Sequence, residues 1–126
     1  MTELSLHIET AKLLAAYSKS SALHFHVPNG EKRGRRTAAR LKQMGVRPGV
    51  SDFVIVVDGL VHFLELKTDK GRLSVDQMCF AEDAQRAGGT FHVAHSLDDV
   101  IDTLNGIGAL RVVLKRACGG RETQLS

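Results

Sequence analysis

Three charged residues, Asp52, Glu65 and Lys67, flank two short apolar runs near the middle of the chain. Asp58 and Gly59 lie between the runs and favour a two-residue hairpin turn. Such a turn places Val57 opposite Leu60 and, further out, Asp52 opposite Glu65. Side chains alternate along a strand, so Lys67 shares the face of Glu65. The pattern predicts two carboxylates and an amine together at one end of a hairpin.

This grouping of charges can support metal-dependent chemistry. Directly opposed carboxylates repel one another unless a cation lies between them. Carboxylate and carbonyl oxygens suit hard ions such as Mg²⁺ or Mn²⁺, which activate water and stabilise the charge that develops on a phosphodiester. The amine of Lys67 adds a positive charge near the reacting oxygens. A frayed strand end carrying an ordinary Glu65 to Lys67 surface pair is the alternative interpretation.

A second charged feature is a basic segment over residues 31–50. It contains seven basic residues and one acid, whereas the whole chain of 126 residues has a net charge of only +3. Lysine and arginine gain affinity for a polyanion by displacing counterions from its phosphates. The alternative is a solvated helix face. The candidate nucleic-acid-binding residues are Lys32, Arg33, Arg35, Arg36 and Arg40.

The order of elements around these residues predicts an α/β fold. Apolar periodicity, turn signals and helix caps predict helices over about 1–20, 37–44, 74–87 and 96–104, and strands over 23–27, 53–57, 60–64 and 90–94. Such interleaving favours a mixed central β-sheet flanked by helices, and both faces of the hairpin are apolar enough to be covered. We expect one domain over 1–106 and an extension of unassigned structure over 107–126.

The N-terminal residues do not resemble a signal peptide, and no apolar run reaches the length of a membrane span. We therefore expect a cytoplasmic protein that has no contact with a membrane. An organic cofactor is not expected.

Five motifs in order resemble the VRR-NUC branch of the PD-(D/E)xK nucleases, whose fold is a restriction-endonuclease-like core. The resemblance covers about residues 9–104, and one departure is Ser51, where the family often has proline. Five motifs at plausible spacing are more specific than any one of them. They are Pro28-Asn29-Gly30, Leu41-Lys42-Gln43-Met44-Gly45-Val46, Gly49-Val50-Ser51-Asp52, Glu65-Leu66-Lys67 and Gly71-x-Leu73-Ser74-x-x-Gln77.

The resemblance implies a role for each matching residue. Asp52, Glu65 and the backbone carbonyl of Leu66 would bind Mg²⁺ or Mn²⁺, and Lys67 would position or activate the nucleophile. Gln77 would complete the catalytic motif. Ser74-x-x-Gln77 is also a helix capping box, so a purely structural role for Gln77 stays open.

The family also carries an acidic residue on its first helix that reaches the metal. Glu9 fits this position because it interrupts a helical stripe formed by Leu6, Leu13 and Ala16, which directs its carboxylate toward the sheet. Glu3, or simple exposure of Glu9, are the alternatives.

Two functions follow from these patterns. The first is a metal-dependent DNA endonuclease that selects structures such as branches, flaps or Holliday junctions and acts as a homodimer, as the resemblance implies. The second is a non-catalytic nucleic-acid-binding module that retains the fold. The pairs His24-x-His26 and His92-x-x-His95 have a spacing that could bind zinc, but no third ligand with suitable spacing is obvious, so a zinc site is disfavoured.

Overall fold

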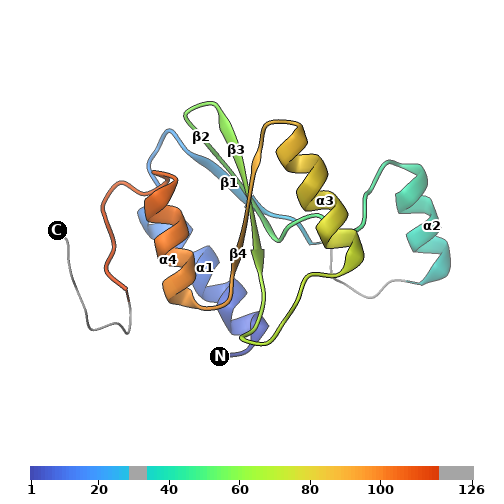
Figure 1. Ribbon diagram of the computed structural model, residues 1–126, viewed down its shortest axis with the longest axis horizontal. Helices are drawn as coiled ribbons and strands as arrows, with labels where there is room; N and C mark the ends of the chain where they lie inside the picture. Colours follow the sequence, from blue (N-terminus) through green and yellow to red (C-terminus); the bar gives the residue numbers. More distant parts are fainter. Residues whose placement is uncertain (29–33, 117–126) are drawn as a thin grey trace.

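The structure, a computed structural model, describes residues 1–28 and 34–116, which contain four helices and four strands (Figure 1). Most elements begin and end within two residues of the predicted positions. Strand β3 runs two residues further than expected, because Glu65 and Leu66 pair with Val93 and Ala94 of the neighbouring strand. The elements are α1 (Glu3–Tyr17), β1 (Leu23–His26), α2 (Arg35–Gln43), β2 (Phe53–Val57), β3 (Leu60–Leu66), α3 (Val75–Arg86), β4 (Thr90–Ala94) and α4 (Leu97–Gly106).

The four strands form one mixed sheet in the order β1-β2-β3-β4. β1 and β2 pair antiparallel, as do β2 and β3, whereas β3 and β4 are parallel and are joined through α3. A parallel connection of this kind needs a crossover, which α3 provides. The fold class predicted from the sequence, an α/β fold with a mixed sheet flanked by helices, is confirmed.

The hairpin between β2 and β3 has the predicted register. Val57 pairs with Leu60 and Phe53 pairs with Leu64, so continuation of the register sets Asp52 opposite Glu65. Asp58 and Gly59 have φ values of 51° and 80°. Positive φ at both central residues is the geometry of the tight turn that matches the twist of the strands.

Helix α1 is rotated relative to the orientation expected from its apolar residues. Leu6, Thr10 and Leu14 are its buried residues, and the Thr10 hydroxyl donates a hydrogen bond to the carbonyl of Leu6 at 2.7 Å. That bond satisfies the hydroxyl inside the core, so a polar residue can belong to the buried stripe. Ala16, which the expected stripe included, is exposed.

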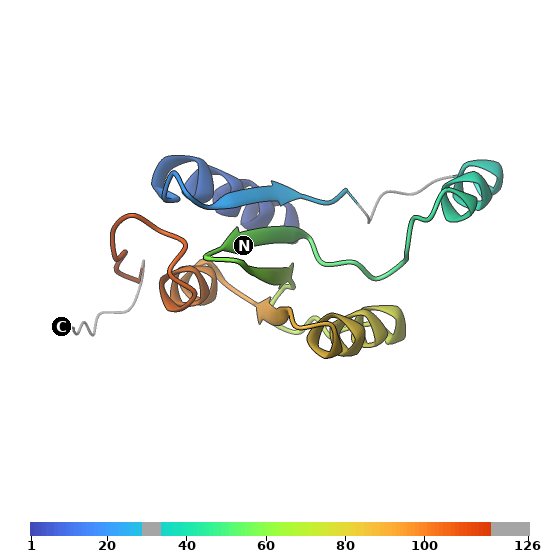
Figure 2. The same ribbon diagram turned by 90° about the horizontal axis from the view of Figure 1, so that it is seen from above.

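The helices form layers on the two sides of the sheet (Figure 2). α1 and α4 pack on the face that carries Phe53, Ile55 and Leu64, where the main core lies. α3 packs on the other face beside β4, with the Phe80 ring 5.0 Å from that of Phe63. The expectation that both faces are covered is met only in part, because the β1 side of this second face has no packed helix in the described chain.

Helix α2 lies apart from the sheet (Figure 2). None of its nine residues is buried. It begins at Arg35, two residues before the predicted start, and Gly45, with φ of 100°, follows its C-cap. α2 is therefore attached to the body through its flanking segments rather than by packing of its side chains.

The chain continues in contact with the body after α4. Ala109 is fully buried, and its carbonyl accepts a hydrogen bond from the N–H of Lys19, while Arg111 donates its N–H to the carbonyl of Tyr17. The packed part of the chain thus extends beyond residue 106, where we expected the domain to end. Among the described helices, none combines the length and apolar character needed to cross a membrane.

Candidate active site

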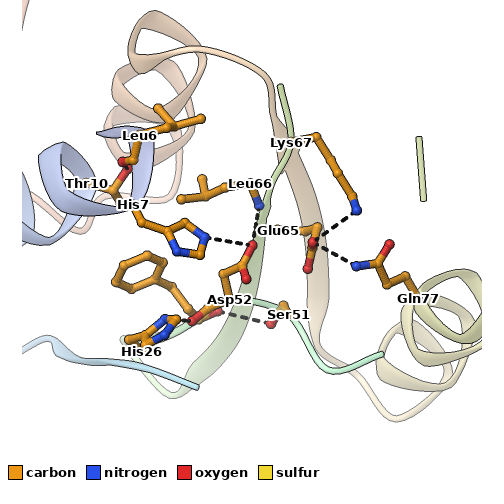
Figure 3. A network of polar contacts seen from close by, with 11 residues as sticks. Leu6, His7, Thr10, His26, Ser51, Asp52, Glu65, Leu66, Lys67 and Gln77 are labelled. Carbon is orange, nitrogen blue, oxygen red and sulfur yellow. Dashed lines mark hydrogen bonds and ion pairs between the residues drawn. The ribbon is translucent and has the colours of Figure 1, made fainter. Parts of the chain in front are cut away.

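Asp52 lies just before β2 and is held at both its backbone and its side chain (Figure 3). Its carbonyl accepts a hydrogen bond from the N–H of Val27, and Nδ1 of His26 lies 2.8 Å from the same oxygen. Its carboxylate oxygen Oδ2 accepts a hydrogen bond from the N–H of Leu66 at 2.8 Å. Asp52 therefore fixes the end of the hairpin as well as supplying a charge.

The N–H of Leu66 also indicates where the carbonyl of the same residue points. In an antiparallel pair, a residue's N–H and C=O both point toward the same neighbouring strand. Since the N–H of Leu66 reaches the Asp52 carboxylate, its carbonyl points to the same side of β3. The predicted backbone ligand thus lies on the side of the strand where Asp52 is found.

Glu65 is almost completely buried, at 2% exposed. Its oxygen Oε2 accepts a hydrogen bond from Nε2 of Gln77 at 3.0 Å and lies 3.8 Å from Nζ of Lys67 (Figure 3). Its other oxygen, Oε1, is buried and has no hydrogen-bond partner among the described residues. An unsatisfied buried carboxylate oxygen is costly, so this atom needs a partner.

The surroundings of Glu65 favour its protonated form. Burial is the main cause, and repulsion by the nearby Asp52 carboxylate adds to it, so that the pKa of Glu65 rises from its ordinary value of 4.5 to about 8. The positive charge of Lys67 opposes this rise. Continuation of the hairpin register sets Asp52 opposite Glu65, which accounts for the repulsion between the two carboxylates.

Lys67 follows β3 and is held over Glu65 by the next turn. The N–H of Gly71 donates to the carbonyl of Thr68, which folds the chain back on itself. A Cβ atom at Gly71 would lie 3.2 Å from Cβ and 3.3 Å from Cδ of Lys67. The lysine side chain, only 16% exposed, is therefore confined between this turn and Glu65.

Gln77 forms the predicted capping box and also contacts Glu65. Its Oε1 accepts a hydrogen bond from the N–H of Ser74, and its own N–H donates to the Ser74 hydroxyl, which together form a capping box. Its Nε2 donates to Glu65. The cap thus orients the amide so that its donor faces the buried carboxylate.

The segment before Asp52 packs directly on the start of α3. Gly49 has φ of 81°, and a Cβ atom there would lie 2.4 Å from the backbone carbon and oxygen of Asp76. Only glycine fits such a contact at this backbone conformation. This close approach joins the Asp52 loop to the helix that carries Gln77.

The sequence interpretation missed two histidines at the site. Nε2 of His7 lies 3.3 Å from Oδ2 of Asp52, and the His7 ring is 5.3 Å from that of His26, which in turn contacts the Asp52 backbone. The Asp52 carboxylate raises the pKa of His7 against the opposing effect of burial. Glu3 and His7 are four residues apart, which is about one helical turn. This spacing could have indicated from the sequence that His7 shares a helix face with an acid.

Glu9 is not brought to this site. Its carboxylate lies 3.7 Å from Nζ of Lys12 and is 43% exposed, so the expectation that it points toward the sheet is wrong. The rotation of α1 around the buried Thr10 is the physical reason. Glu3 is instead the acid of this helix whose charge raises the pKa of both His7 and Glu65.

The predicted nucleic-acid-binding residues lie on or before the separate helix. Arg35, Arg36 and Arg40 are on α2, and all three are exposed. Lys32 and Arg33 lie outside the described residues. Arg47, which follows α2, is engaged in the body, where its guanidinium pairs with Asp83 at 2.6 Å.

The residues at the hairpin end fit a divalent metal ion of the kind that oxygen ligands select. Oε1 of Glu65 is an orphaned buried oxygen, the carbonyl of Leu66 points to the same region, and the Asp52 carboxylate is adjacent. Hard ions of this class take few protein ligands and complete their shell with water. Such a site needs no third side chain, and the described residues contain no group of three or more histidine, cysteine or acidic side chains arranged as a metal site.

Three of the four histidines considered for zinc have other partners. His92 lies 2.8 Å from the Thr90 hydroxyl through Nε2, and His95 lies 3.0 Å from the carbonyl of Thr68 through Nδ1. His26 contacts the backbone of Asp52. Each therefore acts in hydrogen bonding within the fold, as histidines on partly buried strands commonly do.

Comparison with known proteins identifies the fold. No family model matches the chain, and no curated protein matches it. Among solved structures, it is similar to a chain described as "VRR_NUC domain protein", with a TM-score of 0.58 and 22% sequence identity over 79% of this chain and 84% of that chain. The chain thus has the fold of a VRR_NUC domain, which confirms the fold implied by its motifs.

Proposed function

We propose that the chain is a metal-dependent DNA endonuclease whose active site is formed by Asp52, Glu65 and Lys67. The observation that supports this most is the buried oxygen Oε1 of Glu65, which lacks a protein partner in the described chain and lies beside a second carboxylate. A purely structural role does not explain why the fold buries Glu65 beside the partly exposed Asp52, whose negative charge disfavours the ionised form of Glu65. The similarity to a VRR_NUC domain protein supports a nuclease of this class.

In this proposal the residues of the chain share the work of hydrolysis. Asp52, Glu65 and the Leu66 carbonyl would hold Mg²⁺ or Mn²⁺. The bound ion would supply Lewis-acid chemistry that makes water more acidic and stabilises phosphate charge. The Lys67 amine, beside Glu65, would orient the attacking water and add positive charge near the phosphate. Gln77 would keep Glu65 oriented through its capped amide.

We further propose that α2 binds the DNA backbone. Its three exposed arginines belong to a helix that lies apart from the sheet and has no buried residue (Figure 2). Contacts between arginine and phosphate fix position but carry no sequence information. This favours selection of DNA shape, such as a branch, flap or junction, over selection of sequence.

A homodimer is also proposed, with β1 as the contact. Leu23 and Phe25 of this strand are 59% and 47% exposed, and no further strand pairs with its outer edge in the described chain. An exposed apolar edge strand readily pairs with another strand. Antiparallel pairing of β1 with the same strand of a second copy would give the two-fold symmetry usual for dimers.

The test of the proposed function is cleavage of labelled branched and linear DNA in Mg²⁺, Mn²⁺ or a chelator. We expect cleavage only with metal. Lys67→Ala should lower the rate at least about 100-fold because it removes a positive charge from the reacting centre, while DNA binding is retained. Metal-independent cleavage, or none on any substrate, would contradict the proposal.

Lys70→Ala is the matched control for Lys67→Ala. Lys70 is an exposed lysine three residues further along the chain, so this change removes the same charge outside the site. It should leave the rate within about twofold of wild type. Unchanged activity of both Asp52→Ala and Glu65→Ala would instead favour the non-catalytic nucleic-acid-binding module.

A further inference from the structure

One oxygen of the Glu65 carboxylate is fixed and the other is left unpaired. Oε2 has two nitrogen neighbours, Nε2 of Gln77 at 3.0 Å and Nζ of Lys67 at 3.8 Å. Oε1 has no partner among the described residues. The two nitrogen atoms therefore hold the carboxylate so that its second oxygen stays available.

Asp52 is held in the same manner. Its Oδ2 accepts a hydrogen bond from the N–H of Leu66 at 2.8 Å and lies 3.3 Å from Nε2 of His7. Both contacts involve one oxygen, so neither of them engages Oδ1. The His7 ring contacts the Asp52 carboxylate, as the Gln77 amide contacts the Glu65 carboxylate. Figure 3 shows His7 and Gln77 at opposite ends of the pair of carboxylates.

Nε2 of His7 has no hydrogen bond of good geometry in the described structure. It and Oε1 of Glu65 are the two buried side-chain nitrogen or oxygen atoms in the described residues without a hydrogen-bond partner. Both belong to side chains around Asp52. Contacts at active sites are often loosely aligned before the complete complex forms, and they tighten when it does.

The His7 ring is itself fixed by its neighbours. It makes edge contacts with the rings of His26 and Phe53, at centroid distances of 5.3 and 6.0 Å. Leu6, the preceding residue, is 2% exposed and anchors α1 to the core. The imidazole therefore has little freedom to turn away from Asp52.

We infer that His7 is a positioning residue that fixes the Asp52 carboxylate for metal binding, and this rests on the proposed metal-dependent function. Hydrogen bonds to a ligating carboxylate orient it, and loss of such a partner typically weakens metal binding by about 10-fold to 100-fold. The sequence motifs include Gln77, whose side chain contacts Glu65 in the structure, but no residue whose side chain contacts Asp52. The structure assigns that role to the first helix.

The test measures Mn²⁺ affinity of the full chain by calorimetry or by paramagnetic resonance, without DNA. His7→Ala should weaken Mn²⁺ binding about tenfold. His7→Gln should recover most of the affinity, because its amide nitrogen can donate from nearly the same position. At saturating Mn²⁺ the cleavage rate of His7→Ala should return to within a few-fold of wild type, because the substitution affects metal affinity rather than turnover.

His24→Ala is the control, since it removes a histidine of β1 that contacts neither carboxylate in the described structure, and it should leave Mn²⁺ affinity unchanged. Circular dichroism of each variant establishes that it is folded. Equal affinity of wild type and His7→Ala, or a His7→Gln variant as weak as His7→Ala, overturns the inference while the proposed function stands. Absence of Mn²⁺ binding by the wild type overturns the proposed function and the inference with it.

Discussion

The hairpin end and helix α2 carry the two groups of charges in this chain, and they are built in opposite ways. At the hairpin end, Glu65 is 2% exposed and each carboxylate has specific nitrogen partners. On α2, no residue is buried. One region is fixed by contacts on every side, whereas the other is attached only by its ends.

This difference matches what each charge has to do. Hydrolysis of a phosphodiester depends on atoms held within a fraction of an ångström, which only a packed and hydrogen-bonded site provides. Attraction of a polyanion depends mainly on the number of charges and their approximate location. The contrast predicts that changes at the hairpin end impair chemistry and stability, whereas changes on α2 impair binding alone.

Among the changes that test this contrast, Gly49→Ala has the largest expected effect. The new Cβ atom would overlap the backbone of Asp76 at 2.4 Å, at a φ of 81° that already disfavours alanine. We expect cleavage to fall about 100-fold as Asp52 moves, and the free energy of unfolding to fall about 2 kcal/mol more than it does in a Gly45→Ala control. Activity assays and urea denaturation measure the two effects.

Gly45→Ala is the matched change beside α2. Gly45 has φ of 100°, but a Cβ atom at this position would have no heavy atom of the described chain within 4 Å, so the cost is backbone strain alone, about 1–2 kcal/mol. Cleavage should stay within a few-fold of wild type. Equal effects of the two glycine substitutions would contradict the contrast between the regions.

The second effect in size concerns α2. Replacement of Arg35, Arg36 and Arg40 by glutamine should weaken DNA binding about tenfold or more at 0.1 M salt. The slope of log affinity against log salt concentration should become shallower by about three, because three phosphate contacts are lost. The rate at saturating DNA should not change, because helix α2 lies apart from the hairpin end (Figure 1). Fluorescence anisotropy across a salt series measures this.

A charge-matched triple variant controls for net charge. Lys12, Lys19 and Lys115 lie outside α2, and their replacement by glutamine lowers the charge of the chain by the same amount. DNA affinity should fall much less than in the arginine variant. A similar loss in both variants would assign DNA binding to overall charge rather than to α2.

A smaller effect is the pH dependence of stability without metal. The pKa of Glu65 is about 8 in the folded chain, above its ordinary value of 4.5, so the folded state holds this proton more tightly. This tighter proton binding stabilises the folded state fully below about pH 4.5, and the stabilisation is lost as pH rises toward 8. The free energy of unfolding falls by at most about 1.4 kcal/mol per pH unit over this range. Glu65→Gln should remove this decline, measured by urea denaturation in chelator from about pH 5 to pH 9.

A Glu65→Gln variant that declines as steeply as wild type would contradict this assignment. Because Glu65 must lose its proton to bind a cation, metal binding near pH 7 should release up to about one proton. Calorimetry in two buffers of different ionisation enthalpy measures the release.

The hairpin could be predicted from the sequence because its information is local. Asp58 and Gly59 specify one turn, and the turn sets the register from Val57 out to Phe53. The partnership of Gln77 with both Ser74 and Glu65 was predictable only as two alternatives. The spacing of Ser74 and Gln77 defines the cap, but it does not show that the free donor of the amide faces a buried acid.

The contribution of α1 was not predictable for a different reason. A single polar residue, Thr10, belongs to the buried stripe because its hydroxyl bonds to the carbonyl of Leu6 within the helix. Apolar periodicity therefore gave the wrong rotation, so it directed Glu9 inward and did not indicate His7. Which helix face meets a strand much further along the chain depends on tertiary packing, which the pattern of one helix does not contain.

The most direct test of the central claim is the position of Mn²⁺ in crystals of the full chain, located by its anomalous scattering. The account predicts a peak about 2.2 Å from one oxygen of Asp52, from Oε1 of Glu65 and from the carbonyl of Leu66. A peak elsewhere, or none at saturating Mn²⁺, would contradict the claim that these two carboxylates form a metal-binding active site.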